Sequence, residues 1–381
     1  MTSYPMRKPQ VIWKNLLFFI FTTVTMIIGI VGAVQGAGVS AFGWAMFFFY
    51  VAATGMSITV GYHRLFAHRT FEAHPVVEAL ALFFGAAAFE QSAMDWSSQH
   101  REHHKHVDTD LDPYNLREGF LYAHIGWLVF WKHQIDHGNI KDLAKNPLVV
   151  LQDRYYVVWA ILSGFVVPTL IGAAVGHAWE AFWLAACARI VLVHHATFCI
   201  NSVCHLWGKA TYDIHASARD HWFVAFLTNG EGYHNFHHRF AGDYRNGVRW
   251  YQWDPSKWLI ALLSYVGLAK NLKRVSEFSI LEARLAAERE RVEIRFGTLG
   301  DHPVRVRAQR VAQQRYERLQ EALRDWEKAA SEWRVRAMRE TEDQRARLRA
   351  AMAEAEERFR EHRRRWELFV RYRATTLASA L

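Results

Sequence analysis

Cysteine is scarce in this chain of 381 residues, and its scarcity excludes two kinds of scaffold. Only three cysteines occur, Cys187, Cys199 and Cys204, all in or beside one apolar segment and without a CxxC pair. A disulfide framework and a zinc knuckle both need more cysteines or closer pairs. We therefore expect neither.

Charge is also scarce, but only in the first 280 residues. These contain 41 Lys, Arg, Asp and Glu side chains, whereas the last 101 residues contain 42. Because so uneven a chain is not a single soluble globule, we predict a membrane domain over 1–280 and a charged, coiled-coil-like helical extension over 281–381. The chain has a net charge of +9, 16 tryptophans and long apolar runs. Basic residues attract anionic lipids and tryptophans favour the membrane interface, so we expect membrane lipid, and not nucleic acid, as the partner.

Four apolar runs reach the length of about 20 residues that a bilayer requires. The predicted spans cover residues 16–34, 41–60, 155–176 and 182–200. The run Val76–Met94 contains two glutamates and is expected not to cross. Basic residues precede the first span, namely Arg7, Lys8 and Lys14, whereas the short links 35–40 and 177–180 contain none. The four runs predict an all-α integral membrane protein, and the distribution of basic residues predicts that both termini lie in the cytoplasm. We expect the membrane to be a bacterial cytoplasmic membrane.

The 21 histidines include three clusters whose spacing predicts a metal site. An HRxxxH segment contains His63 and His68, and two HxxHH segments contain His100, His103 and His104, and His234, His237 and His238. Residues at i, i+3 and i+4 share one face of a helix, so each HxxHH segment can present three imidazoles to one point. Clustered imidazoles are costly to bury without a ligand, and imidazole binds iron, copper, nickel and zinc. The four predicted spans leave all three clusters on the same side of the membrane.

These motifs, in this order and with these spans between them, resemble the membrane-bound fatty acid desaturases of the stearoyl-CoA desaturase type. The resemblance extends from about Gly61 to Ile260 and includes Asp108–Tyr114, Asn201–His205, Gly230–His234, Asp243–Gly247 and Asp254–Trp258. It implies a cytoplasmic helical cap in which nine histidines hold two irons. The matching residues are His63, His68, His100, His103, His104, His205, His234, His237 and His238. It also implies that Asn201 reaches the second metal through water. Zinc could occupy the iron sites as a non-native metal.

The chemistry that the resemblance implies explains the need for metals. A methylene in an acyl chain has no acidic proton and no leaving group, so its oxidation needs a redox metal and dioxygen as co-substrate. The family type implies a cis double bond at the ninth carbon. Carboxylates are expected to orient the imidazoles, and Asp108, Asp110 and Glu231 are candidates by their proximity in sequence, the alternative being loop turns and helix caps.

The resemblance also bears on the substrate. It places Gln91, Trp96 and Thr197 where the acyl channel bends in stearoyl-CoA desaturases. The charged residues that contact coenzyme A in the animal enzymes are replaced here by Ser98, Gln99 and Trp131, and only Lys132 is retained. We therefore favour an acyl-lipid substrate over acyl-CoA, with acyl carrier protein as a further alternative.

The charged extension lacks proline and glycine from residue 305 to 373, which favours long helices. Apolar residues alternate spacings of three and four along a heptad seam of Tyr316, Leu319, Leu323, Trp326, Ala330, Trp333 and Ala337. After an eleven-residue step, which we interpret as a stutter, the pattern resumes at Leu348, Met352, Ala355, Phe359, Trp366 and Phe369. We expect a coiled coil or a helical hairpin, rather than one solvated helix, and association of chains through it.

The extension does not resemble a fused cytochrome b5 domain, so a separate electron donor such as ferredoxin or cytochrome b5 is expected. Two other functions compete with desaturation. A membrane diiron fatty acid or alkane hydroxylase would use the same metals. A metal-dependent receptor or transporter would not be an enzyme, but the predicted spans contain no acidic or polar path.

Overall fold

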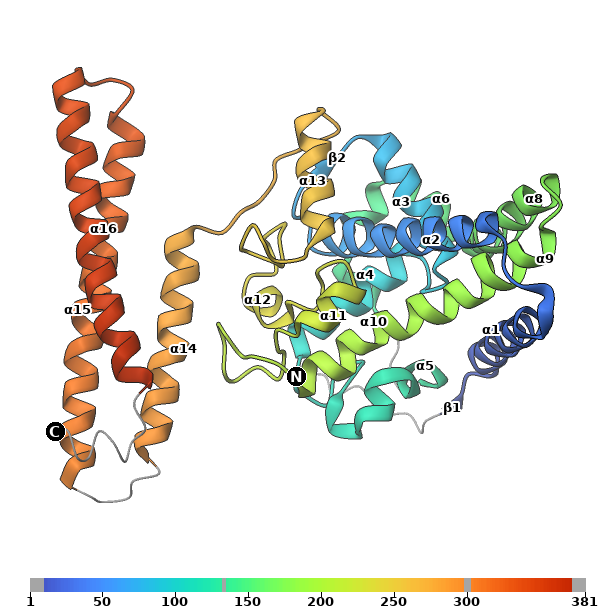
Figure 1. Cartoon of the computed structure of the whole chain (residues 1–381), viewed down its shortest axis with the longest axis horizontal. Helices are drawn as coiled ribbons and strands as arrows, with labels where there is room; N and C mark the ends of the chain where they lie inside the picture. The colour runs from blue at the N-terminus through green and yellow to red at the C-terminus, as the bar shows by residue number, and fades with distance from the viewer. Residues whose placement is uncertain (1–9, 132–134, 298–302, 372–381) are drawn as a thin grey trace. The chain divides into compact units, whose positions relative to one another are not determined.

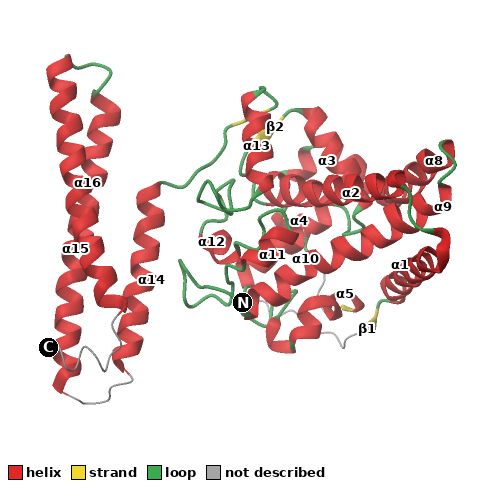
Figure 2. Ribbon diagram, viewed as in Figure 1, coloured by secondary structure: helices red, strands yellow, loops and turns green. Residues whose placement is uncertain are grey.

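The computed structural model describes residues 10–131, 135–297 and 303–371, and these are mostly helical (Figure 1, Figure 2). Arg7, Lys8 and Lys132 lie outside the described residues. Two compact units are present, one formed by Met1–Ala210 and His215–Arg274, the other by Thr211–Ile214 and Val275–Leu381. The boundary predicted after residue 280 falls inside helix α14 (Glu277–Gly297).

The first unit contains thirteen α-helices among its described residues. They are α1 (Trp13–Gly32), α2 (Ala41–Met56), α3 (Pro75–Ala87), α4 (Ala93–His106), α5 (Trp127–Val129), α6 (Pro147–Arg154), α7 (Tyr156–Ile161), α8 (Val167–Ala174), α9 (Ala178–Glu180), α10 (Arg189–Leu206), α11 (Trp222–Leu227), α12 (His234–Arg239) and α13 (Pro255–Tyr265). Tighter or wider turns form η1 (Ala33–Ala37), η2 (Ser57–Ala67), η3 (Leu116–Glu118), η4 (Tyr122–Gly126), η5 (His137–Asn139), η6 (Leu143–Lys145), η7 (Leu162–Val166) and η8 (Ala181–Ala188). Four two-residue strands pair antiparallel, β1 (Gln10–Val11) with β3 (Phe130–Trp131) and β2 (Glu72–Ala73) with β4 (Ala269–Lys270).

Four helical segments are long and apolar enough to cross a membrane, which confirms the predicted number. They are Trp13–Gly36, Ala41–Ala67, Tyr156–Ala174 and Ala178–Leu206. Helix α3, within the run predicted not to cross, has only 13 residues. A bilayer needs about 20, so this helix does not span it.

The second span ends in the π-helical segment η2, which packs closely against α3. A Cβ added at Gly61 would lie 2.7 Å from the Cβ of Ala81, and one at Gly85 would lie 2.3 Å from the ring of Tyr62. The absence of side chains at both glycines therefore permits a contact that alanine would block. This packing fixes the end of the span from which His63 projects.

Local capping fixes the helices that follow. The hydroxyl of Ser92 accepts a hydrogen bond from the backbone N–H of Asp95 at the start of α4. At the start of α13, the Asp254 carboxylate accepts one from the backbone N–H of Lys257. Such side chains satisfy N–H groups that a helix leaves unpaired, which sets where each helix begins.

The second unit is built from α14, α15 (Pro303–Arg336) and α16 (Glu342–Arg371). Its described core is apolar and aromatic and draws on all three helices, with Leu285, Leu319 and Trp366 among the most deeply buried residues. The ring of Trp326 stacks on that of Phe359, with centroids 5.3 Å apart. The predicted seam therefore packs within its own chain.

One expectation for this unit needs correction. The eleven-residue step is not a stutter in a continuous coiled coil, because α15 ends at Arg336 and the chain turns before α16 starts at Glu342. The hairpin alternative is the one observed, with α14 as a third helix that the sequence reading did not include. Trp326 and Phe359 pack within the unit, and association between chains through it stays a prediction.

Candidate metal centre

A π-helical turn brings the first two histidines together. The backbone N–H of His68 donates to the carbonyl of His63 at 3.0 Å, an i→i+5 hydrogen bond. Their ring centroids lie 4.8 Å apart. An α-helix turns about 100° per residue and would rotate two residues five apart to different faces, whereas the wider π-turn keeps them on one.

The two HxxHH segments lie on α4 and α12, and each divides its histidines between two groups. The first group contains His63, His68, His100, His104 and His237. The second contains His103, His205, His234 and His238. The expectation that three imidazoles of one segment share a point was therefore wrong. Histidines at i and i+4 stay together, while the remaining one is rotated by about 100° toward the other group.

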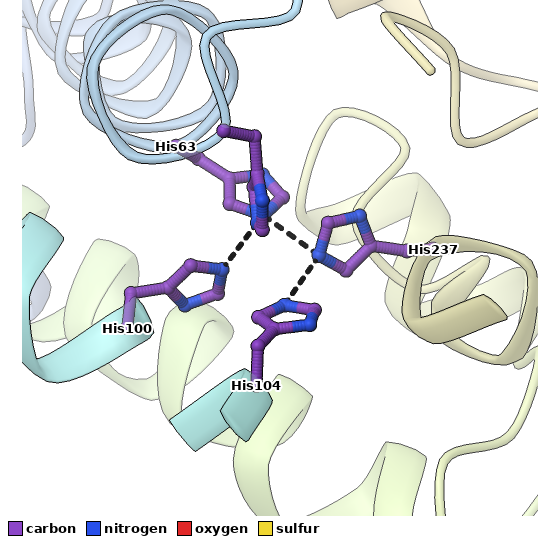
Figure 3. A group of neighbouring side chains, drawn as sticks. His63, His100, His104 and His237 are labelled. Carbon is purple, nitrogen blue, oxygen red and sulfur yellow. Dashed lines mark hydrogen bonds between the residues drawn. The ribbon is translucent and has the colours of Figure 1, made fainter. Parts of the chain in front are cut away.

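Within each group the Nε2 atoms converge. In the first group, the Nε2 of His237 lies 3.0 Å from that of His63 and 2.8 Å from that of His104. Figure 3 shows the labelled rings of this group arriving from three elements and facing a common point. In the second group, the Nε2 of His234 lies 3.0 Å from those of His205 and His238.

Three side chains fix the outward-facing ring nitrogens. The Nδ1 of His63 lies 2.7 Å from a carboxylate oxygen of Glu231. The Nδ1 of His103 lies 2.8 Å from Asp112. A carboxylate only accepts hydrogen bonds, so each Nδ1 carries the hydrogen and each Nε2 keeps a lone pair directed inward. The hydroxyl of Ser217 lies 2.6 Å from the Nδ1 of His205.

Glu231 belongs to a buried polar network. One of its oxygens accepts from Arg64 at 2.9 Å, and the other accepts from the side-chain amide of Asn246 at 2.6 Å. Arg64 also pairs with Asp254 at 3.0 Å. Burial alone would raise the pKa of Glu231, but His63 and Arg64 lower it below its usual value, so the carboxylate is ionised.

The imidazoles themselves are held neutral. The pKa lies well below its ordinary value for His68, His100, His104, His234, His237 and His238. Burial is the main cause, because it disfavours the charged ring, and neighbouring imidazoles add to the effect. Neutral rings with lone pairs directed inward repel one another unless a cation lies between them. Both groups therefore fit a metal ion with nitrogen-rich coordination.

A cavity of about 570 Å³ reaches both histidine groups. Its lining includes His63 and His100 from the first group and His103 and His234 from the second. Most of the other lining side chains are apolar or aromatic and come from the spans, from α11 and from the loop before α13. The volume is within the usual range of about 300–1,000 Å³ for ligand pockets.

Two carboxyl groups line this cavity, Glu231 of the buried network and Glu90. Glu90 accepts hydrogen bonds from the indole N–H of Trp96 at 3.3 Å and from the hydroxyl of Thr197 at 2.9 Å. The Trp96 ring stacks on His100, with centroids 4.7 Å apart. Burial raises the pKa of Glu90 to about 7, although both hydrogen bonds oppose this shift.

Comparison with known proteins identifies the family. The model of the fatty acid desaturase family matches residues 41–261, which is more than half of the chain.

The chain belongs to this family.

It is 40% identical over 262 residues to acyl-CoA desaturase 1 of Saccharomyces cerevisiae, which covers 67% of this chain and 51% of that protein. It is 34% identical to stearoyl-CoA desaturase 5 of Homo sapiens over 287 residues, or 74% of this chain and 86% of that protein. The sn-1 stearoyl-lipid 9-desaturase of Anabaena variabilis is 34% identical over 281 residues, or 72% of this chain and 98% of that protein. The chain thus spans about half the length of the yeast relative.

The other predicted residues of this desaturase family member are dispersed. Asn201 lines the same cavity as His103 and His234. Asp108 accepts a hydrogen bond from the backbone N–H of Ser217, whose hydroxyl adjoins His205. Asp110 must be corrected, because its side chain is 79% exposed and lies 3.8 Å from Arg117, away from the imidazoles.

The three residues of the channel prediction lie at one cavity, and their role in bending the acyl chain stays a prediction. Trp96, Thr197 and Gln91 all line the cavity, but Glu90 joins Trp96 to Thr197, while the Gln91 side chain is bonded to Gln99. The sequence reading also missed Asp112, which contacts His103. The signals that were available are a charged residue inside an apolar run for Glu90 and the DxDxDP segment for Asp112.

Proposed function

We propose that this family member is an oxygen-dependent fatty acyl desaturase that introduces a cis double bond near carbon 9 of a saturated chain. The observation that carries the proposal is the position of the apolar cavity, whose lining includes histidines of both groups. A chain lying in this cavity would have its reacting carbons beside the metals. Desaturases of acyl-CoA and of stearoyl-lipid among the relatives give further support.

The nine histidines would hold two irons. The proposed reaction takes two hydrogen atoms from adjacent methylenes, two electrons from a donor protein, two protons and one dioxygen, and it yields one double bond and two water molecules. Bound iron supplies the oxidising power that an unactivated C–H bond requires. Glu231 and Asp112 hold His63 and His103 in a single tautomer with Nε2 facing inward.

The substrate chain is positioned by groups that cannot move freely. Trp96 is stacked on His100 and bonded to Glu90, and Glu90 is bonded to Thr197. We propose that this linked trio, with Glu90 in the role expected of Gln91, sets the bend of the acyl chain beside the metals. A chain held at a fixed depth would then react at one position.

We propose a membrane lipid as the acyl carrier. Ser98 and Gln99, which replace charged residues of the animal enzymes, are buried and bonded within the protein, so they are not available to a nucleotide. Phe48 and Leu192 line the cavity from two spans and are also 61% and 42% exposed. An acyl chain could therefore enter from the bilayer. In the proposed orientation both termini face the cytoplasm of a bacterial cell.

The test is expression in a host that lacks unsaturated fatty acids, followed by mass spectrometry of its lipids. Aerobic cells are expected to gain monounsaturated chains with the double bond near carbon 9, and anaerobic cells or a His103→Ala variant are not. Hydroxy acids as the main product would replace desaturation by hydroxylation. Purified enzyme that converts free acyl-CoA and leaves phospholipid chains untouched would reverse the choice of carrier.

A further inference from the structure

The chain bends sharply between α3 and α4, on both sides of Glu90. Phe89 and Gln91 have positive φ angles of 58° and 78°. Residues other than glycine rarely adopt this left-handed conformation, and they keep it only where the surrounding structure holds them in place. Backbone strain of this kind is concentrated at functional sites. Here it occurs in the segment that carries the Glu90 carboxyl group into the acyl cavity.

Two buried side chains of the fourth span hold the backbone before the bend. The last carbonyl groups of a helix have no partner within it. At the end of α3, Arg189 donates a hydrogen bond to the carbonyl of Ala87. The Nε2 of His194 donates one to the carbonyl of Ala88 at 2.7 Å. Helix α10 therefore fixes the two peptide groups that precede Phe89.

Arg189 binds peptide groups of three separate segments. Besides Ala87, its guanidinium donates to the carbonyls of Gly164 in η7 and Ala185 in η8, each at 3.1 Å. Gly164 also leaves space for the start of the bend, because a Cβ there would lie 2.4 Å from the ring of Phe89. A buried guanidinium is costly to desolvate, and an apolar side chain could fill the same space without that cost. The position that Arg189 imposes on its neighbours explains its presence better than stability does.

Two side chains from another part of the chain hold the backbone after the bend. The hydroxyl of Tyr156 accepts a hydrogen bond from the backbone N–H of Gln91 at 3.1 Å. The side-chain oxygen of Gln152, which is fully buried, accepts one from the backbone N–H of Ala93 at 3.1 Å. Glu90 thus lies between two stretches of backbone that are held by side chains from outside the segment.

We infer that Arg189, His194 and Tyr156 are positioning residues that determine which carbon of the acyl chain is oxidised. They act by fixing the backbone on both sides of Glu90. The inference rests on the proposed function, because it assigns to these residues the choice of carbon in that reaction. Of the three, only His194 lines the cavity. Arg189 and Tyr156 therefore act through the backbone and not by touching the substrate.

The depth of the bend decides the carbon. An acyl chain that bends beside Glu90 presents to the metal-binding histidines the carbons that lie at the bend. Displacing a reacting group by about 1 Å can lower its rate about 100-fold. Moving the bend by one methylene is a displacement of comparable length. A small shift of Glu90 would therefore slow oxidation at the original carbon and favour a neighbouring one.

The experiment compares the products of full-length variants in the host that lacks unsaturated fatty acids. Arg189→Met and His194→Leu remove the donors at the end of α3, and Tyr156→Phe removes the acceptor at Gln91. His194→Gln is the conservative variant, because a glutamine amide can still donate to the carbonyl of Ala88. Mass spectrometry locates the oxidised carbon in each product, and metal content is measured on each purified protein.

The matched control for Tyr156→Phe is Ser163→Ala. It also removes one hydroxyl from the third span, and this hydroxyl is buried and bonded to the carbonyl of Trp159 in the same span. Ser163→Ala and His194→Gln are expected to give the same single positional isomer as the unsubstituted protein. The other three variants are expected to form double bonds at neighbouring carbons, with unchanged metal content. Their rate at the original carbon should fall by up to about 100-fold. A loss of stability alone would lower total product without moving the double bond.

An unchanged ratio of positional isomers in Arg189→Met, His194→Leu and Tyr156→Phe would overturn the inference and leave the proposed function intact. A shift of the same size in Ser163→Ala would also overturn it. Absence of any oxidised product from unsubstituted protein with full metal content would overturn the proposed function and the inference together.

Hydroxy acids as the product would overturn desaturation alone, and the position of the hydroxyl group would then test the same three residues. If Arg189→Met loses metal, the result is decided by His194→Leu and Tyr156→Phe, each of which removes a single hydrogen bond to the bend.

Discussion

Each unit contains a carboxylate held by arginine, buried in the first unit and half-buried in the second, and the two carboxylates have different uses. In the second unit, Glu288 is bound by Arg363 at 2.6 Å and by the indole N–H of Trp366 at 3.1 Å. In the first, Glu231 is bound by Arg64 and adjoins His63. Burial would raise the pKa of both carboxylates, but their cationic neighbours lower it in each case.

The two carboxylates differ in the groups that surround them. Glu288 on α14 is bound by Arg284 of the same helix and by Arg363 and Trp366 of α16, so its bonds link two helices. His63 has a second ring nitrogen, which faces other imidazoles instead of a hydrogen-bond donor that would satisfy it. A buried ionised carboxylate is therefore no sign of function by itself. The informative feature is the neighbouring imidazole of His63, whose second ring nitrogen faces other imidazoles and no hydrogen-bond donor.

The largest expected effect comes from the imidazoles. Replacing His103 or His104 by Ala removes one nitrogen from the second or first group respectively. We expect metal content to fall well below two ions per chain, because the damaged group loses one of its nitrogen donors. Desaturation should become undetectable. Metal analysis and lipid mass spectrometry measure both, with His106→Ala on the same helix as the control. Full metal content in both variants would refute the assignment.

The next test compares the two carboxylates directly. Glu231→Gln keeps the shape of the side chain but weakens its hold on His63, so we expect about 10- to 100-fold lower metal affinity or activity. Glu288→Gln is the matched change in the other unit and should leave metal content and product formation unaltered. Metal titration of both purified variants measures the difference in metal affinity between them. Equal losses would mean that the contrast between the two carboxylates is wrong.

A smaller effect is expected from Glu90. Its pKa of about 7 makes it mostly neutral below that pH and mostly ionised above it. Ionisation puts charge into the acyl cavity, so KM for the acyl substrate should rise several-fold as pH increases through about 7. Glu90→Gln cannot ionise and should show a flatter profile. An unchanged profile in this variant would show that the pH dependence has another source.

The smallest effect on chemistry is expected from the second unit. Trp366 is fully buried there, so Trp366→Ala should destabilise this unit by about 3–5 kcal/mol. Limited proteolysis of the full chain in urea would detect earlier cleavage of α16. Leu368 on the same helix is 49% exposed, and Leu368→Ala should cleave like the unsubstituted protein. Loss of metal from Trp366→Ala would mean that this unit supports the catalytic site.

The sequence predicted those features that depend on periodicity and composition. Four apolar runs gave the spans, and the i, i+4 spacing of His100 and His104 placed them on one face. The association of His63 with His68 could not be predicted in this way, because it depends on a π-turn that no residue pattern specifies. Division of each HxxHH segment between two groups depends on where the neighbouring helices lie.

Irregular backbone explains the remaining differences. Phe89 and Gln91 both have positive φ, 58° and 78°, so the chain bends sharply on either side of Glu90. A bend of this kind decides which partners two adjacent side chains reach within the cavity, and residue spacing does not specify it. Asp112 reaches His103 through the turn that follows α4, whereas Asp110 in the same segment faces outward.

The division of α4 and α12 between two groups has a thermodynamic consequence. Each of these helices supplies imidazoles to both histidine groups, so an ion bound in one group would immobilise a backbone that also carries donors for the other. The second ion then binds to donors whose conformational entropy has already been lost, and the two binding free energies are coupled. We expect loading to be positively cooperative, with chains holding either both ions or none and few holding a single one.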